Sequence, residues 1–314
     1  MLRMEVTCKS TTLPNRLRWR TRAAYNADAM THASAILDPL ALPQPDSPLL
    51  AEFLRAFGIP RDLPPEQLLS AVGAAFARLP YENLTKIIRA AASGSVVESR
   101  RVPAVVLADH FQVGTGGTCF SLTATLLHLI RALGWRAEPI LADRRYGADT
   151  HCALVVWIDG RPHLLDPGYL ITSPLLLPET GEIARDTEFN QVLLRATAGG
   201  SRVELRTRQN GHESMRLTFK SAPVDRCEFL KAWDASFDWD MMHYPLLTRV
   251  SGHRQTFLNR NRLQVRSSQD VTRLEVDPNQ LIERIQQEFG IAPEVVANAL
   301  AILNRQGVRD AGGS

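Results

Sequence analysis

The sequence lacks the features that mark several specialised classes of protein. It has four cysteines in 314 residues, irregularly spaced and without a C-x-x-C pair: Cys8, Cys119, Cys152 and Cys227. A disulfide framework needs a higher density and a structural zinc site needs closer ligand spacing, so neither is expected. No run approaches the ~20 apolar residues of a membrane helix, and the N-terminus has no apolar signal core. We therefore expect reduced thiols in the cytoplasm, no membrane partner and no bound metal.

An excess of one charge is also missing. The 36 Lys and Arg residues nearly balance the 33 Asp and Glu residues, and the formal net charge is +3. Because basic residues are scattered beyond the first stretch and aromatics are not interleaved with them, we expect no nucleic acid partner. The content of 45% hydrophobic and 22% charged residues is that of an ordinary globular protein. A chain of this length is too long for one compact core and suits several layers.

The first 29 residues have a composition of their own. They contain five arginines but two acidic residues. This bias is typical of a disordered basic arm, although an extension upstream of a true start at Met30, or a transit peptide, would have the same composition. Residues 38–48 form a proline-rich linker. We predict that residues 1–46 are arm and linker and that the folded part begins near Ser47.

Helical signals fill the first third of the folded part. Ser47 followed by proline is a helix start, because proline is tolerated where the amide is unpaired, and that helix ends before Gly58. Apolar residues at helical spacing predict a second helix over residues 65–79. A third opens after a Gly-Gly turn, with Thr118 as its cap, and runs to Gly134. Residues 47–134 are therefore predicted to be a helical bundle carrying Cys119.

The apolar period changes from helix to strand at Arg136. Strands are expected at residues 137–142, 151–158, 161–166, 190–197, 201–208 and 214–220. Further along, the sequence predicts a helix from Asp225 to Asp238, strand-like segments through residues 265 and 271–276, a capping box at Asp277–Gln280 before a helix, and a last helix over 293–304. Residues 307–314 are expected to be a loose tail. Helices, then antiparallel strands, then a mixed end indicate an α+β protein.

Cys119 is the first candidate for chemistry. It follows Gly116 and Gly117, which let the backbone bend sharply and leave room for a substrate, and it opens a helix. A thiol in the first turn of a helix faces unpaired amides and the positive end of the dipole, which favours thiolate. The alternative is a buried structural cysteine, as most free cysteines are.

A hairpin supplies the second candidate. Asp159-Gly160 between two β-rich runs predicts a two-residue turn in which Ile158 faces Arg161. Side chains 151, 153, 164 and 166 then point to one face, with His151 and Asp166 as diagonal neighbours. Diagonal positions are ~7–8 Å apart, within reach of an imidazole and a carboxylate. Pro167 has no amide to give, so the ladder should end at Asp166. A surface His–Asp pair without a role is the alternative.

The remaining candidates lie away from this face. His163 falls on the opposite face of the hairpin, and His128 lies half a turn around the helix from Cys119. Cys152 is expected to point away from the face of His151. A Cys–His–Asp set, in which Asp orients the ring and His takes the thiol proton, follows the general logic of an activated nucleophile.

Four short motifs then occur in a specific order: residues 80–84 (PYENL), 116–120 (GGTCF), 151–155 (HCALV) and 165–169 (LDPGY). In this order they resemble the arylamine N-acetyltransferases, over roughly residues 48–290. The resemblance implies an N-terminal helical bundle, a central antiparallel β-barrel at 135–222 and an α/β lid at 223–306. It also implies a triad of Cys119, His151 and Asp166 that accepts an acyl group from a thioester and passes it to an amine in a ping-pong cycle.

The resemblance implies further site residues and several departures. Substrate or co-substrate contacts fall on Gly116, Gly117, Phe120, Gly168, Tyr169 and Glu82, although Glu82 has a structural role as its alternative. The family's Arg-Gly-Gly-x-Cys has Thr115 in place of arginine, so Glu82 must find another donor. Ser121 and Thr123 replace an acidic residue and Asn, and Leu170 replaces a second glycine. These changes spare the triad and leave the acyl donor and the acceptor open.

Three hypotheses follow. The first is an N-acyltransferase that takes its acyl group from acetyl-CoA, another acyl-CoA or an acyl carrier protein and gives it to a small-molecule amine. Thioesters suit such a site because a thiolate exchanges readily with them. The second is a cysteine hydrolase or transglutaminase-like enzyme with the same triad. The third is a non-catalytic binding relative.

Overall fold

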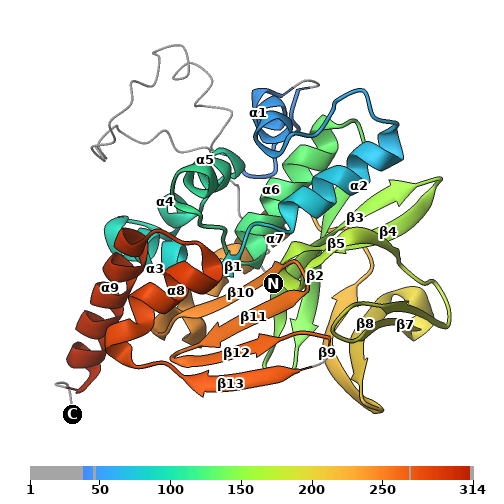
Figure 1. Cartoon of the computed structure of the whole chain (residues 1–314). Helices are drawn as coiled ribbons and strands as arrows, with labels where there is room; N and C mark the ends of the chain where they lie inside the picture. The colour runs from blue at the N-terminus through green and yellow to red at the C-terminus, as the bar shows by residue number, and fades with distance from the viewer. Residues whose placement is uncertain (1–37, 45–46, 269, 312–314) are drawn as a thin grey trace, which may run out of the picture.

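The computed structural model describes residues 38–44, 47–268 and 270–311 (Figure 1). The predicted basic arm lies outside the described residues. Within the described part, no helix is long and apolar enough to span a membrane. The chain forms helices first, an eight-stranded antiparallel sheet next, and a smaller sheet with two covering helices last. The predicted α+β class is confirmed.

Six helices make up the first segment: α1 Pro48–Phe57, α2 Pro65–Phe76, α3 Leu84–Ala92, α4 Val96–Ser99, α5 Pro103–Val113 and α6 Cys119–Ala132. The predictions of α1, α2 and α6 are confirmed, whereas α3, α4 and α5 were missed. The buried side of α3 contains Thr85 and Lys86 beside Leu84 and Ile87, so its apolar periodicity is broken. Ser47 makes no side-chain cap, and its hydroxyl instead contacts Nε2 of His128 at 3.0 Å.

The eight-stranded sheet curls into a nearly closed barrel (Figure 1). Its strands are β2 Ala137–Arg144, β3 Gly147–Ile158, β4 Arg161–Asp166, β5 Ile171–Leu176, β6 Glu182–Asp186, β7 Gln191–Thr197, β8 Arg202–Gln209 and β9 His212–Lys220. They lie in the order β5-β4-β3-β2-β9-β8-β7-β6. The β3–β4 hairpin has the predicted register, with Ile158 opposite Arg161. Strands β5 and β6 were missed, since both are short and β5 contains a proline.

The last segment begins with α7 Arg226–Ala235 and continues with strands β10 Leu246–Ser251, β11 Arg254–Asn259, β12 Arg262–Arg266 and β13 Val271–Glu275. These four strands are joined at one edge by β1 Tyr81–Glu82, which comes from the helical segment. Helices α8 Leu281–Phe289 and α9 Pro293–Ala311 pack beside this sheet (Figure 1).

Two terminal predictions need correction. Asp277 accepts a hydrogen bond from the Asn279 amide at the head of a 3-10 turn, and no capping box forms there. The capping box stands instead at the start of α7, between Asp225 and Glu228. Helix α9 continues to Ala311, into the segment predicted to be loose, because no proline follows residue 293 to end it.

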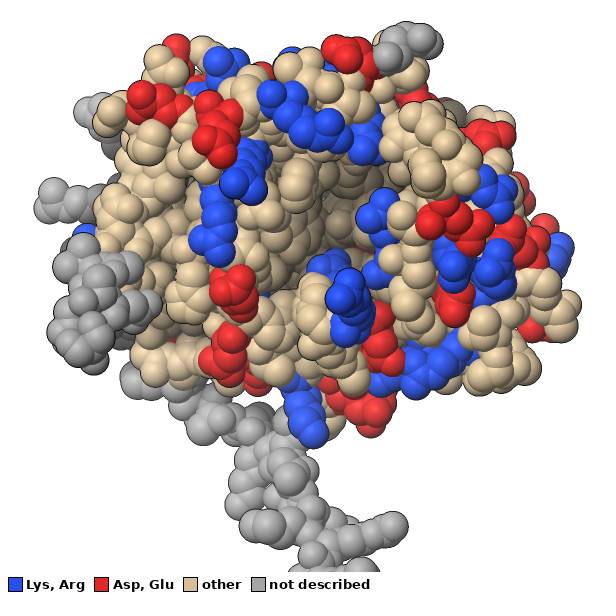
Figure 2. Space-filling view, turned by 90° about the horizontal axis from the view of Figure 1, so that it is seen from below, with Lys and Arg blue, Asp and Glu red and all other residues tan. Residues whose placement is uncertain are grey.

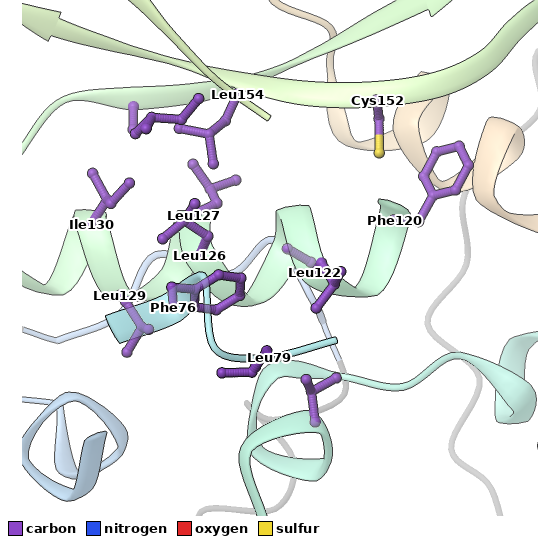
Figure 3. Packing of buried hydrophobic residues seen from close by; sticks show 14 of the residues in the cluster. Phe76, Leu79, Phe120, Leu122, Leu126, Leu127, Leu129, Ile130, Cys152 and Leu154 are labelled. Carbon is purple, nitrogen blue, oxygen red and sulfur yellow. The ribbon is translucent and has the colours of Figure 1, made fainter. Parts of the chain in front are cut away.

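Helix α6 lies at the centre of the largest core cluster. Its apolar side chains, Leu122, Leu126 and Leu129 among them, pack between the α2 region and β3 (Figure 3). Leu154 and Cys152 of β3 point toward this helix (Figure 3). Because a closely packed core resists displacement, the first residue of α6 is held at a fixed place against the barrel.

Candidate active site

Cys119 is the first residue of α6 and is 2% exposed. The turn before it is tied to β1, since the Gly117 amide donates to the Pro80 carbonyl at 3.2 Å and the Glu82 amide donates to the Gly117 carbonyl at 2.9 Å. A Cβ on Gly116 would lie 1.8 Å from the Pro80 oxygen, so the backbones approach too closely for a side chain. The glycine pair thus sets the entry of the chain into the helix.

His151 and Asp166 form the predicted pair. Nε2 of His151 lies 2.7 Å from Oδ2 of Asp166, and neither side chain is exposed. The other carboxylate oxygen accepts the Tyr169 amide at 2.8 Å, so Asp166 also caps the 3-10 turn Pro167–Tyr169. With its carboxylate fixed by the turn, Asp166 can hold the imidazole in one orientation.

Gly168 is the point where these elements meet. A Cβ built on it would lie 2.9 Å from Cβ of Cys119 and 3.0 Å from Cε1 of His151. The thiol and the imidazole therefore border the same space, and the imidazole favours the thiolate form of Cys119. A thiol, an imidazole and a carboxylate linked in this order are what an activated thiol nucleophile requires.

Replacing Gly168 by alanine should separate these groups. The new methyl has too little room against Cys119 and His151, so both must shift, and we expect kcat/KM to fall roughly 10- to 100-fold, as for a displacement of about 1 Å. Steady-state kinetics measure this. Gly94→Ala is the control, because Gly94 is exposed and a Cβ there would have its nearest neighbour at 3.7 Å. If Gly168→Ala were as active as Gly94→Ala, the close approach of Gly168 to Cys119 and His151 would be contradicted.

Cys152 lies on the side of β3 that its strand position predicts. It lies on the opposite face of β3 from Ala153. That face packs on α6, where the Thr123 hydroxyl donates to the Cys152 carbonyl at 3.4 Å. The Cys152 thiol therefore points away from the face of His151, as expected, but it interacts with the Cys119 thiol from the side of α6, which strand alternation alone did not predict.

The surroundings of Cys119 favour the thiolate. The interaction with Cys152 lowers the pKa of the Cys119 thiol, burial opposes it, and His151 and Arg144 lower the pKa further, leaving it well below its usual range. Burial and the charge of Arg144 lower the pKa of His151, but the charge and hydrogen bond of Asp166 together with the interaction with Cys119 outweigh them, and the net shift is upward. Burial and the bond to Cys119 raise the pKa of Cys152, which therefore stays a thiol and donates.

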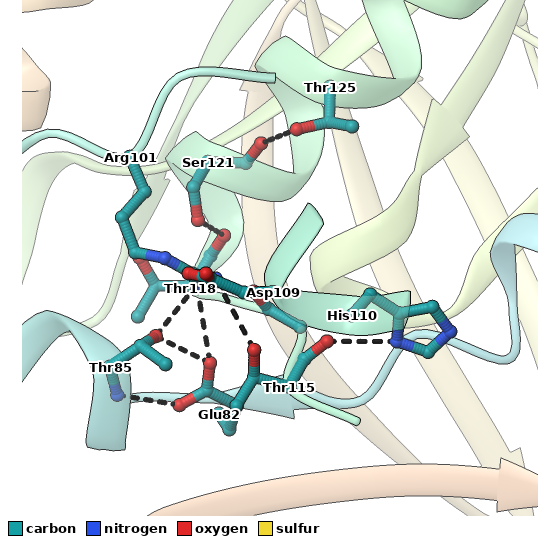
Figure 4. A network of polar contacts seen from close by, with 10 residues as sticks. Glu82, Thr85, Arg101, Asp109, His110, Thr115, Thr118, Ser121 and Thr125 are labelled. Atoms are coloured by element: carbon teal, nitrogen blue, oxygen red, sulfur yellow. Dashed lines mark hydrogen bonds and ion pairs between the residues drawn. The ribbon is translucent and has the colours of Figure 1, made fainter. Parts of the chain in front are cut away.

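Arg101 is the donor that Glu82 requires, and sequence analysis missed it. Its guanidinium lies 3.4 Å from the Glu82 carboxylate, donates to the Thr85 hydroxyl at 2.7 Å and to the Gly116 carbonyl at 2.5 Å, and pairs with Asp109 at 2.8 Å (Figure 4). Arg101 is 3% exposed and Glu82 is fully buried. The network anchors the turn that precedes Cys119, so Glu82 has a structural position here.

Arg144, at the end of β2, was also missed. Its Nη2 lies 2.9 Å from Nδ1 of His151, and its charge acts on the thiol of Cys119. Nothing in its local sequence distinguishes it from the adjacent Arg145. Strand β2 pairs with β3 so that Ala142 lies opposite His151. Arg144 lies two residues further along β2, at the same end of the pair.

The other predicted site residues differ in their relation to Cys119. Phe120 is fully buried among Phe229, Trp233 and Trp239. Tyr169 is half-buried and packs against the barrel core. Leu170, in place of a glycine, has φ 65°, a left-handed conformation that costs a leucine about 1–2 kcal/mol. The loop after Asp166 thus retains the glycine-like backbone although the glycine is lost.

The described residues contain no group of three or more His, Cys, Asp or Glu side chains that could hold a metal ion. The site that they do form, a buried thiol beside an imidazole that is bonded to a carboxylate, has the arrangement that an activated thiol nucleophile requires.

Comparisons with known proteins agree. A sequence model for the family described as N-acetyltransferase matches residues 66–297. The arylamine N-acetyltransferase of Salmonella typhimurium aligns with a TM-score of 0.68 and 18% identity over 81% of this chain and 98% of its own. The Mycobacterium marinum enzyme in complex with CoA has a TM-score of 0.66 and 17% identity, over 82% of this chain and 98% of its own.

A Bacillus cereus arylamine N-acetyltransferase, described as having a unique Cys-His-Glu catalytic triad, aligns with a TM-score of 0.64 and 17% identity, over 78% of this chain and 99% of its own. A search of curated proteins finds no match. The chain belongs to the N-acetyltransferase family, with the fold of the arylamine N-acetyltransferases, and is an acyltransferase.

Proposed function

We propose that this acyltransferase carries its acyl group on Cys119 and transfers it from a thioester to a small-molecule amine. The observation that carries the proposal is the grouping of Cys119, His151 and Asp166, with the thiol and the imidazole both against Gly168 and the carboxylate 2.7 Å from the ring. In this grouping Cys119 is the nucleophile, His151 the base and Asp166 the group that orients the ring.

The reaction has two steps. The thiolate sulfur of Cys119 attacks the thioester carbonyl, the new C–S bond forms, and the donor leaves with the electron pair of the broken C–S bond. The amine nitrogen then attacks the acyl-cysteine, the amide C–N bond forms, and the sulfur leaves as thiolate. Nδ1 of His151 is the proton acceptor for the amine, since Nε2 is bonded to Asp166.

The donor we propose is an acyl-CoA such as acetyl-CoA, with an acyl carrier protein as the second possibility. The lower face of the molecule has a central hollow with Lys and Arg side chains at its rim (Figure 2). Both donors carry phosphate, which basic side chains attract. The thiolate needs reducing conditions, in agreement with a cytoplasmic enzyme.

Gly168 and Tyr169 would border the acyl group, because Gly168 contacts both Cys119 and His151. Gly116, Gly117, Phe120 and Glu82 would act through the backbone around the thiol rather than by touching substrate. The amide of Cys119, at the start of a helix, is a candidate oxyanion donor. The 2% exposure of Cys119 favours an amine acceptor over water.

The test is a mass measurement. The full chain is incubated with acetyl-CoA, and in a second arm with an acetylated carrier protein, and the intact mass and peptide map are recorded. We expect one acetyl group on Cys119 that is lost on adding an arylamine, with the amide as product. Cys227→Ser is the control, because Cys227 is exposed and lies in α7. If neither donor gave an acyl adduct, the proposal would be contradicted. If the acetyl group on Cys119 were lost to water and no amide formed, the enzyme would be a hydrolase.

A further inference from the structure

Arg144 is held against the ring of His151 by contacts on both sides. Its Nη2 donates to Nδ1 of His151 at 2.9 Å and its Nη1 donates to the Tyr146 hydroxyl at 2.8 Å. Its own amide donates to the Thr150 hydroxyl at 3.2 Å, which fixes the backbone where β2 turns into β3. The guanidinium is therefore positioned by the hairpin rather than free to swing at the surface.

No carboxylate accompanies this guanidinium. Among the ion pairs of the described residues, none joins Arg144 to Asp or Glu, although its side chain is half-buried. The groups of opposite potential charge that face it are Tyr81, Cys119, Tyr146 and Tyr169. A partly desolvated cation is costly without an anion, and of these four groups the thiol of Cys119 is the one that ionises near neutral pH.

The other titratable groups facing Cys119 cannot supply a constant positive charge. They are Tyr81 of β1, Lys86 of α3, and His151 and Cys152 of β3, with Asp166 behind the imidazole. Burial lowers the pKa of Lys86 to about 7, so its charge is partly lost at neutral pH. Tyr81 and Cys152 are neutral when protonated. Arg144 alone among them stays charged at every pH that matters.

The contact also decides where the imidazole holds its proton. A guanidinium can donate but cannot accept, so Nδ1 of His151 must be the acceptor in this arrangement. The single ring proton is then on Nε2, facing Asp166 at 2.7 Å. Asp166 and Arg144 fix the same tautomer from opposite ends of the ring.

We propose that Arg144 is a positioning residue of the acyl-transfer site, which fixes the Nε2 tautomer of His151 and stabilises the Cys119 thiolate by its charge. The proposal rests on the function given above. The charge of Arg144 favours the thiolate and also lowers the pKa of His151, opposing the rise that Asp166 causes, so it favours the neutral imidazole that must accept a proton from the amine. In that step the hydrogen bond from Arg144 to Nδ1 breaks as Nδ1 takes the amine proton. The sulfur leaves as a thiolate whose charge the guanidinium stabilises.

The experiment measures alkylation of Cys119 by iodoacetamide from pH 5 to 9 on the full chain, with peptide mapping. Removing the cation raises the pKa of the thiol, so less thiolate is present on the acid side. We expect Arg144→Gln to slow alkylation at pH 6 roughly 3- to 10-fold and to leave the rate at pH 9 unchanged. Arg145→Gln is the matched control, being the adjacent, exposed arginine of the same turn.

A second variant separates charge from geometry. Arg144→Lys keeps the charge but loses the planar donor, so its alkylation profile should stay near that of the wild type while kcat for acyl transfer falls several-fold. Identical alkylation profiles of Arg144→Gln and Arg145→Gln, or unchanged kcat in Arg144→Lys, would overturn the proposal. Because alkylation needs no substrate, this result is independent of whether the donor and acceptor classes above are correct.

Discussion

Cys119→Ser should reduce acyl transfer by a factor on the order of 10⁴ or more. A serine hydroxyl is not ionised at neutral pH, and every contact that favours the thiolate, from Cys152, His151 and Arg144, acts on a charge that serine does not develop. Kinetics with acetyl-CoA and an arylamine measure the loss, and intact mass should reveal no acyl adduct. The substitution is nearly isosteric, so the thermal midpoint should change little.

The control is Cys227→Ser, which removes an exposed thiol from α7 and should keep full activity. An active Cys119→Ser enzyme would remove Cys119 from the role of nucleophile. A variant that is inactive but also melts far below the wild type would instead indicate that the thiol is a packing residue of α6.

Arg101→Met should lower the free energy of unfolding by about 3–5 kcal/mol, because it leaves a buried carboxylate without its cation. Glu82 is fully buried and would keep only Thr85 as a donor, through its amide at 2.9 Å and its hydroxyl at 2.6 Å. The Gly116 carbonyl would lose its donor as well. Urea unfolding followed by circular dichroism gives the free energy.

Arg100→Met is a matched comparison one residue away. Arg100 pairs with Asp234 at 2.5 Å, but the aspartate is 37% exposed, and such pairs contribute about 0–1 kcal/mol. If the two substitutions cost the same, the buried network around Glu82 would not stabilise the turn before Cys119. Arg101→Met should also reduce activity, since that turn sets the position of the thiol.

The parts of the site that local chemistry determines could be predicted. The Asp159-Gly160 turn fixes the register of its hairpin, and the register brings His151 to the side of Asp166, as the observed pairing confirms. A Gly-Gly pair before an apolar periodic run likewise locates the start of α6. Each of these conclusions needs residues that are close in the chain.

The parts that depend on packing between distant segments could not. Cys152 follows strand alternation, yet which face of β3 meets α6 is decided by tertiary packing. Arg101 lies 19 residues from Glu82, and no periodicity or turn signal links them. Helices α3 and α5 were missed because their buried sides include polar or few apolar residues, whose partners become visible only in the folded chain.

The origin of Arg101 has a consequence for how this enzyme compares with its relatives. The resemblance to the arylamine N-acetyltransferases implies an arginine at position 115, where this chain has Thr115, whereas here the cation comes from Arg101 in the link between α4 and α5. The two positions are therefore coupled: a graft of the Gly-Gly-Thr-Cys segment into a relative would arrive without its anchor unless residues 100–103 travelled with it. Conversely, Thr115→Arg alone would bring a second guanidinium, beside that of Arg101, to the carboxylate of Glu82. An arginine at position 115 therefore cannot replace Arg101 through single substitutions made one at a time.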